Sequence, residues 1–216
     1  MTDIIKRTME NLEKNHMQAF FAENQDEAKK IALSLINEGD TIGVGGSVTL
    51  NQLNLLTVFR NGDYNFLDRY GDKTAEEIHE IFHKSLSADA YFLSANAVTE
   101  NGELYNVDGT GNRAAALIYG PKKVIVIVGK NKIVRNIDEA VLRVKSIAAP
   151  LNCQRLNKKT PCATIGKCIA FTDGGALNPT AGCHSKDRIC RDYIITGEQV
   201  NPDRIKVIIV NEDMGY

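Results

Sequence analysis

Two continuous runs of valine and isoleucine constrain the fold more than any other feature of this sequence. The residues 124–128 read Val-Ile-Val-Ile-Val, and 206–210 read Lys-Val-Ile-Ile-Val. Such runs are typical of strands in a parallel sheet that is covered on both faces, because neither face then exposes side chains to water. Two shorter runs, Thr41–Val44 and Ala90–Leu93, also have strand character. The sequence therefore predicts a buried, largely parallel sheet.

Helical periodicity separates these strands. Ile5, Met9 and Leu12 share one helical face, and apolar residues recur at helical spacing over 28–36, 78–86 and 140–147. Capping pairs precede the last three segments, namely Asn24 with Glu27, Thr74 with Glu77 and Asn136 with Glu139. Helices that alternate with strands predict a Rossmann-like open α/β sheet, and 216 residues favour one domain over 1–216.

Charge and hydropathy exclude several functional classes. Lys plus Arg total 26 and Asp plus Glu 27, so a net charge of −1 gives no basic surface for nucleic acid or an anionic membrane. No apolar run approaches the ~20 residues of a membrane helix. The first 20 residues are charged and amphipathic, without a signal-peptide core. We therefore expect a cytoplasmic protein with neither nucleic acid nor membrane as a partner.

Four cysteines crowd into a segment that breaks the α/β rhythm. Residues 150–191 are rich in Cys, Gly, Pro, Lys and Thr and lack sustained periodicity, which predicts a long irregular, functional segment. Disulfides are rare in a reducing compartment, so a metal site is the better interpretation. Its expected ligands are Cys162, Cys168, Cys183 and Cys190. Their spacing fits neither a CxxC pair nor a ferredoxin pattern, so iron–sulfur and zinc both remain open at this point.

Basic residues flank these thiols, and we expect them to lower the thiol pKa values and to offset the charge of a thiolate site. They are Lys158, Lys159, Lys167, Lys186, Arg188 and Arg191. The fifth cysteine, Cys153, is interpreted as packing or as a spare thiol. The alternative for all of them is that they are small buried residues.

Two polar loops follow predicted strands. Gly43–Ser47 follows the first strand, where glycines let backbone N–H groups approach an anion; a plain tight turn is the alternative. The segments 94–103 and 106–113 follow the strand Ala90–Leu93, at an edge where open α/β sheets bind ligands. Asn101-Gly102 predicts a hairpin turn between 98–100 and 103–107. Turn chemistry alone is again the alternative.

One motif is misleading. His79-Glu-Ile-Phe-His83 matches the HExxH pattern of zinc proteases. However, Ile78, Ile81 and Phe82 define the buried stripe of this helix, which turns His83 away from it. A solvated helix face is therefore the better interpretation.

Taken together, these segments resemble the LUD-domain (lactate-utilisation) family over essentially the whole chain. The residues that carry the resemblance are GVGGSVTL at 43–50, SANAVTENGEL at 94–104, NVDGTGNR at 106–113, GKNKIV at 129–134, RLNKKTPC at 155–162, RIC at 188–190 and VNEDMGY at 210–216. The resemblance implies a fold of the NagB/ribose-5-phosphate isomerase/CoA-transferase type. It also implies a component of an iron–sulfur lactate-oxidising system.

Carried over to this chain, the resemblance implies a ligand cleft between two loops, with Lys132 as a third wall. The ligand-binding residues expected there are Gly45, Gly46, Ser47, Asn96, Asn106, Thr110, Asn112, Arg113 and Lys132. Asp108 or Glu100 would act as general base. The expected ligand is a small anionic metabolite, such as lactate, a related organic acid or phosphate.

The resemblance also favours an iron–sulfur cluster of the 4Fe–4S type over zinc at the four cysteines. One departure is an insertion, 169–182, which separates Cys168 from Cys183 where the family has a CxxC-like spacing. Two alternatives stay open: a structural-zinc, ligand-binding protein without catalysis, and a sugar-phosphate isomerase or CoA-transferase-like enzyme. With the lactate-oxidising interpretation we also expect redox partner subunits and a homo-oligomer.

Overall fold

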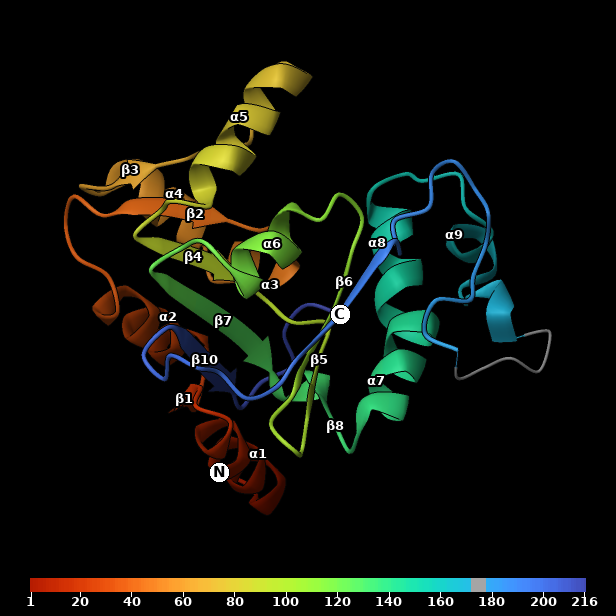
Figure 1. Cartoon of the computed structure of the whole chain (residues 1–216), viewed down its shortest axis with the longest axis horizontal. Helices are drawn as coiled ribbons and strands as arrows, with labels where there is room; N and C mark the ends of the chain where they lie inside the picture. Colours follow the sequence, from red (N-terminus) through yellow and green to blue (C-terminus); the bar gives the residue numbers. More distant parts are fainter. Residues whose placement is uncertain (172–177) are drawn as a thin grey trace.

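The structure is a computed structural model that describes residues 1–171 and 178–216. Its centre is a sheet of six parallel strands (Figure 1). In spatial order these are β1 (Gln18–Ala22), β10 (Ile205–Val210), β7 (Lys123–Gly129), β4 (Ala90–Leu93), β2 (Thr41–Val44) and β3 (Asn65–Phe66). The predicted parallel sheet is therefore confirmed, with both Val/Ile runs side by side in the middle.

The central strands are buried on both faces. In β7, Ile125 and Ile127 face one apolar core, and Val124, Val126 and Val128 face another. This alternation follows from the two-residue period of a strand. It explains why the sequence carries no polar residue in this run.

Helices cover both faces. The chain forms α1 (Asp3–Lys14), α2 (Gln25–Ser34), α3 (Val48–Gln52), α4 (Leu55–Asn61), α5 (Ala75–Ser85), α6 (Asn112–Ile118), α7 (Ile137–Arg143), α8 (Ala149–Arg155) and α9 (Pro161–Ile165). Helices α2, α3 and α4 pack on one face of the sheet, and α1 and α6 on the other. The side chains of Asn24, Thr74 and Asn136 accept the expected N-cap hydrogen bonds at the starts of α2, α5 and α7. Within the described residues, no helix is long and apolar enough to cross a membrane.

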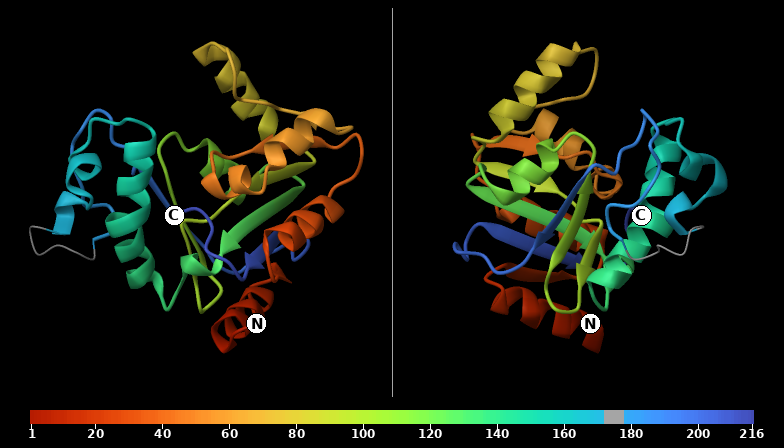
Figure 2. Two further views of the ribbon diagram at one scale, coloured as in Figure 1. Left: turned by 180° about the vertical axis from the view of Figure 1, so that it is seen from behind. Right: turned by 45° about the vertical axis from the view of Figure 1, so that its right-hand side comes forward.

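A second, smaller sheet lies over the face that α1 and α6 cover. Its order is β8 (Ile133–Val134), β5 (Ala97–Thr99), β6 (Leu104–Asp108) and β9 (Asp192–Thr196). The predicted hairpin is the antiparallel pair β5–β6. Val98 and Leu104 on one side of this sheet join the main core, whereas Tyr105 and Val107 pack against α7. Figure 2 shows the resulting layers, with α7 and α8 outside the small sheet.

The segment 150–191 is less irregular than the sequence predicts. Residues 137–155 form one helical run, in which the π-helical turn Val144–Ala148 joins α7 to α8. Pro150 directly follows this π-helical turn, and because it has no N–H to donate to the preceding turn, it interrupts the regular hydrogen-bond ladder of the run. Helix α9 and the 3-10 turn Ile169–Phe171 follow. Of the expected insertion 169–182, residues 172–177 lie outside the described residues.

The β5–β6 hairpin is anchored on α1. Asn11 Nδ2 donates to the Glu100 carbonyl at 2.7 Å, and Asn15 Nδ2 to the Gly102 carbonyl at 2.9 Å. Gly102 has φ +79°, and a Cβ there would stand 2.4 Å from the Asn11 carbonyl carbon. The turn therefore requires glycine for two reasons, its left-handed backbone and its contact with the helix.

We expect Gly102→Ala to destabilise the protein by about 3 kcal/mol, because left-handed strain and overpacking against backbone add. The control is Gly39→Ala, which has the same φ of +79° but nothing within 4 Å of its added Cβ. It should cost about 1 kcal/mol. Urea denaturation measures both, and equal losses would contradict this account of the hairpin.

Candidate functional site

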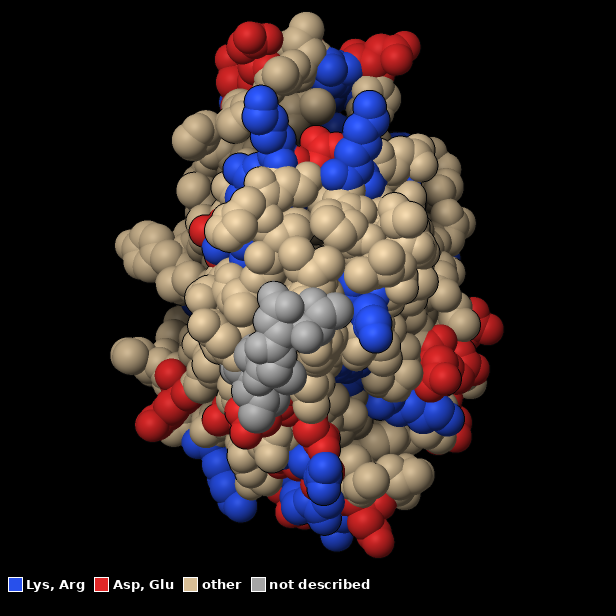
Figure 3. Space-filling view, turned by 90° about the vertical axis from the view of Figure 1, so that its right-hand side faces the viewer, with Lys and Arg blue, Asp and Glu red and all other residues tan. Residues whose placement is uncertain are grey.

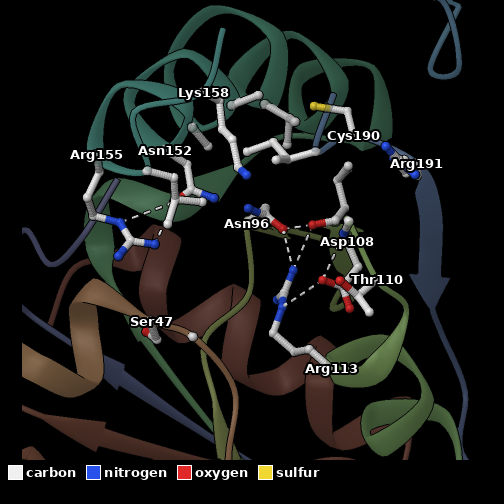
Figure 4. A pocket seen from close by; sticks show the side chains of 18 of the residues that line it. Ser47, Asn96, Asp108, Thr110, Arg113, Asn152, Arg155, Lys158, Cys190 and Arg191 are labelled. Carbon is white, nitrogen blue, oxygen red and sulfur yellow. Dashed lines mark hydrogen bonds and ion pairs between the residues drawn. The ribbon is translucent and has the colours of Figure 1, made fainter. Parts of the chain in front are cut away.

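A cleft of about 540 Å³ opens at the carboxyl ends of the central strands. Ser47 follows β2, Ser94 follows β4, and Lys132 ends the 3-10 turn Lys130–Lys132 after β7. The loop from Asp108 to Arg113 forms a second side, and α8 with residues 186–191 forms the third (Figure 4). The two loops predicted from the sequence therefore do line one cleft.

Arg113 joins the two sheets beneath this cleft. Its guanidinium donates to the Ser94 carbonyl (2.9 Å), Asn106 Oδ1 (2.6 Å), Asn96 Oδ1 (3.1 Å) and the Val107 carbonyl (2.8 Å). Ser94 belongs to the end of the main sheet, whereas Asn106 and Val107 belong to the small one. Gly45 lets the Arg113 side chain pass, since a Cβ there would stand 2.9 Å from Arg113 Cδ.

Lys132 is a buried cation in the cleft wall. Its side chain is 3 % exposed, and Nζ donates to Thr49 Oγ1 at 3.1 Å and Ser94 Oγ at 3.0 Å. Burial, reinforced by the nearby charges of Arg143 and Arg113, lowers the pKa of Lys132 to about 7. No carboxylate among the described residues forms an ion pair with it.

Positive charge dominates the lining. Eight lining side chains are basic and two, Asp108 and Asp187, are acidic. Arg113 forms an ion pair with Asp108, Nε to Oδ1 at 3.9 Å. The other seven have no carboxylate partner within 1–171 and 178–216, and they are Arg69, Lys132, Arg155, Lys158, Lys186, Arg188 and Arg191. Such a lining attracts anions.

The two carboxylates proposed as general base lie in different places. Asp108 lines the cleft, and its oxygens accept from the backbone N–H groups of Gly109 and Ala114, both at 3.0 Å, so it also holds the start of α6. Glu100 is not among the lining residues. Its carboxylate forms an ion pair with Arg7 of α1. A catalytic role for Asp108 stays a prediction, and a ligand in the cleft would not touch Glu100.

The remaining predicted residues divide in the same way. Gly46, Ser47, Asn96, Thr110 and Asn112 line the cleft, as do Arg113 and Lys132. Asn106 lies behind Arg113, 1 % exposed, and its Nδ2 has no hydrogen-bond partner among the described residues. Gly45 likewise does not line the cleft, but it leaves room for the Arg113 side chain, which does.

Sequence reasoning missed the wall that α8 and the chain end provide. Arg155 donates to Asn152 Oδ1 at 2.8 Å and to Tyr216 Oη at 2.7 Å. All three residues line the cleft. The sequence signal for this wall is the basic character of residues 155–159 and 186–191. From the sequence, the charges there are assigned only to the neighbouring thiols.

The four predicted metal ligands surround a second, smaller cavity. Cys162, Cys168, Cys183 and Cys190 all line this space of about 30 Å³, which holds little more than a water molecule. Arg188 fixes part of its rim by donating to the carbonyls of Cys183 (2.9 Å) and Cys190 (2.7 Å). In the part of the chain that the structure describes, no three Cys, His, Asp or Glu side chains stand in a metal-binding arrangement. The thiols thus share one cavity without forming a closed ligand set.

Burial outweighs the basic neighbours at one of these thiols. The pKa of Cys190 is raised to about 12, first by burial and then by the other thiols, while Arg188 lowers it only in part. The expectation that flanking Lys and Arg lower the thiol pKa values is therefore wrong for Cys190. Cys153 is also buried, and burial raises its pKa to about 11.

The two cavities share a wall. Val144, Ala149, Arg188 and Cys190 line both of them. Figure 3 views the outer face of this layer, whose middle is largely uncharged while Lys and Arg side chains gather along its upper edge.

The HExxH residues lie on an exposed helix. His79 and His83 are exposed on α5, which projects from the main sheet (Figure 1), and the His79 ring packs edge-on against Phe82. This agrees with a solvated helix face.

Comparisons with known proteins give one family. The model of the LUD domain matches residues 5–210. A DUF162 family protein from Deinococcus radiodurans matches with a TM-score of 0.52 and 16 % identity, over 97 % of each chain. This likeness confirms the α/β fold class. No curated protein matches the sequence significantly.

Two further solved structures are more distant. The tetrameric eIF2B-beta2-delta2 complex from C. thermophilum has a TM-score of 0.45 and 19 % identity, over 86 % of this chain and 55 % of that one. Ribose 5-phosphate isomerase A from Methanocaldococcus jannaschii has a TM-score of 0.35 and 18 % identity, over 53 % and 56 %.

We expect Lys132→Met to stabilise the ligand-free protein by about 3 kcal/mol at pH 6, because it removes a buried charge. Between pH 7 and about 10.4 the unfolded chain holds a proton on Lys132 that the folded chain has lost. The unfolding free energy of the unsubstituted protein therefore rises with pH in this window, and the gain from Lys132→Met shrinks.

Urea denaturation at pH 6 and pH 10 measures this difference. The control is Lys130→Met, an exposed lysine of the same turn, which should change stability little at either pH. A gain from Lys132→Met that is the same at both pH values would rule out this account of the buried lysine.

Proposed function

Given that this chain belongs to the LUD-domain family, we propose that it is a redox-associated protein of the lactate-utilisation type. The cleft binds a small anionic organic acid or phosphate, and the adjoining cysteines hold an iron–sulfur cluster. The observation that carries the proposal is the set of seven basic side chains around the cleft that form no ion pair with a carboxylate of the described residues.

Lys132 supports an anionic ligand most directly. A buried ammonium without a counter-ion is costly, and folding tolerates it only when other interactions offset the cost. A carboxylate or phosphate oxygen in the cleft would supply the missing charge. Thr49 and Ser94 orient Nζ by accepting two of its three protons, which leaves the third for the ligand.

Several residues of this chain would position the ligand. Ser47 and the Gly46 backbone border one side, and Asn96 and Thr110 the other. Asn96 Oδ1 accepts from Arg113 and from the Val107 N–H, so its amide nitrogen faces away from these bonds and can donate. Asp108 is the one predicted general base that a ligand there could meet.

The donor set of the small cavity supports a cluster. Its metal-ligating side chains are four thiols, the ligand type that iron–sulfur clusters and zinc share. Cys162, Cys168, Cys183 and Cys190 would hold the cluster after a local inward adjustment. A bound cluster supplies one-electron oxidation and reduction. Because Cys190 borders both cavities, the cleft and the cluster would be neighbours.

The alternative of a sugar-phosphate isomerase or CoA transferase has less support. Such chemistry calls for a free general base or nucleophile in the cleft. Of the two acidic lining residues, Asp108 binds two backbone N–H groups and Asp187 accepts from the Lys159 N–H at 2.8 Å. Binding of an anion beside a redox centre does not require either carboxylate to act as a general base or a nucleophile.

We expect lactate and orthophosphate to bind more weakly as the pH rises above 7. Protonated Lys132 attracts the anion, and in the free protein it loses its proton near pH 7. Above that pH, binding must take up a proton, so Kd should rise by up to about tenfold per pH unit.

Isothermal titration calorimetry at pH 6.5 and 8.5 in two buffers of different ionisation enthalpy measures both Kd and proton uptake. Lys132→Met should abolish the pH dependence and weaken binding at pH 6.5, whereas Lys130→Met should do neither. A Kd that does not change with pH in the unsubstituted protein would contradict the role of Lys132.

We expect anaerobically reconstituted protein to contain iron and acid-labile sulfide and to show visible absorption that dithionite bleaches. Cys162→Ser, Cys168→Ser, Cys183→Ser and Cys190→Ser should each lower the iron and sulfide content strongly. The matched control is Cys153→Ser, which removes a buried thiol that does not line the cavity. A colourless protein with one zinc and no sulfide would instead establish the structural-zinc alternative.

A further inference from the structure

The cleft is larger and more positive than a three-carbon hydroxy acid needs. Its volume of about 540 Å³ lies in the range of pockets that bury drug-sized ligands. Eight basic side chains face two acidic ones there, although the chain as a whole has a net charge of −1. One carboxylate would balance one of these charges and leave most of the cleft to water.

The basic side chains differ in how much of their hydrogen bonding is already used. Arg113 and Arg188 donate to backbone carbonyls and side-chain oxygens of the protein. The ammonium groups of Lys158 and Lys186, by contrast, make no hydrogen bond or ion pair to any residue that the structure describes. Arg155 is intermediate, because its Nε and Nη2 donate hydrogen bonds while its Nη1 donates to none of the described residues.

Two hydrogen bonds bring the two free lysines to the same rim. The Lys159 N–H donates to Asp187 Oδ2 at 2.8 Å, and Ser185 Oγ donates to the Lys159 carbonyl at 2.9 Å. The loop that carries Lys186 is thereby tied to the backbone just after Lys158. In Figure 4, Lys158 extends from the α8 wall into the cleft, toward the side where Asn96 and Asp108 lie.

The basic side chains of the cleft come from two parts of its lining. Lys132 follows β7, where the strands end, and can meet one ligand oxygen. Arg155, Lys158 and Lys186 belong to the side that α8 and residues 186–191 form. Several lysine and arginine side chains together suit a group with several charged oxygens better than they suit a single carboxylate.

We propose that the cleft takes an organic diphosphate, with the diphosphate on Lys158, Lys186 and Arg155 and the organic end toward Lys132 and Asn96. This rests on the proposed anion-binding function and specifies its substrate class. A ligand of this kind balances more of the basic side chains than a monocarboxylate does. It also fills more of the volume of about 540 Å³ than a three-carbon acid would.

Calorimetry on the full chain with four probes tests the proposal: ADP, inorganic pyrophosphate, orthophosphate and lactate. We expect ADP and pyrophosphate to bind at least tenfold more tightly than orthophosphate or lactate. The double variant Lys158→Gln/Lys186→Gln should weaken pyrophosphate binding at least tenfold, and far more than lactate binding.

The matched control is Lys159→Gln/Lys167→Gln, which removes the same charge from exposed neighbours that do not line the cleft. It should leave the Kd for pyrophosphate within about twofold, since exposed charges at a distance are screened by salt. Circular dichroism of both double variants verifies that they fold.

The outcomes separate this inference from the function on which it rests. If lactate binds as tightly as pyrophosphate, or if Lys158→Gln/Lys186→Gln leaves pyrophosphate binding intact, the diphosphate proposal is wrong and the anion-binding cleft stands. If none of the four probes binds, the proposed anion-binding function itself is wrong.

Discussion

The hydrogen bonds of the Arg113 guanidinium are the contacts on which the rest of the site depends. The side chain is 12 % exposed, and it donates to oxygens at the end of the main sheet and to oxygens of the small sheet, so it joins the two sheets at the cleft. Gly45 is required on one side because a methyl group would displace Arg113. Removing most of an arginine side chain from water is costly unless its donors are satisfied; here backbone and amide oxygens accept from Arg113, and Asp108 forms an ion pair with it.

The electrostatics of the cleft work against the stability of the ligand-free protein. Lys132 and Arg143 are buried cations, and burial lowers the pKa of each. Thr49, Ser94, Asn96 and Asn131 offer them neutral acceptors only. A protein that needed only to fold could replace these residues by apolar ones with little loss, as buried ion pairs in other proteins show. The anion proposed for the cleft would complete this set, and the charge of Lys132 would then link stability, binding and pH.

Helices α7, α8 and α9 form the outer layer of the site. It supplies one wall of the cleft and most of the cysteine cavity, and Cys190 belongs to both. The Deinococcus radiodurans protein keeps this fold at 16 % identity over 97 % of each chain. The fold therefore persists between two chains of low sequence identity.

The sequence by itself determined what depends on local interactions. The Val/Ile runs form β7 and β10, Thr74 and Glu77 form a capping box, and Asn101-Gly102 forms a hairpin turn. Each depends on the side-chain pattern, capping or turn geometry of a few consecutive residues. Only the tertiary structure decided the long-range contacts. The pairing of β9 with β6, the ion pair of Glu100 with Arg7, and the meeting of Arg155 with Tyr216 each join segments far apart in the chain. The same holds for the thiols: their spacing indicated a metal site, but burial, which depends on all the layers at once, decided that Cys190 has a raised pKa.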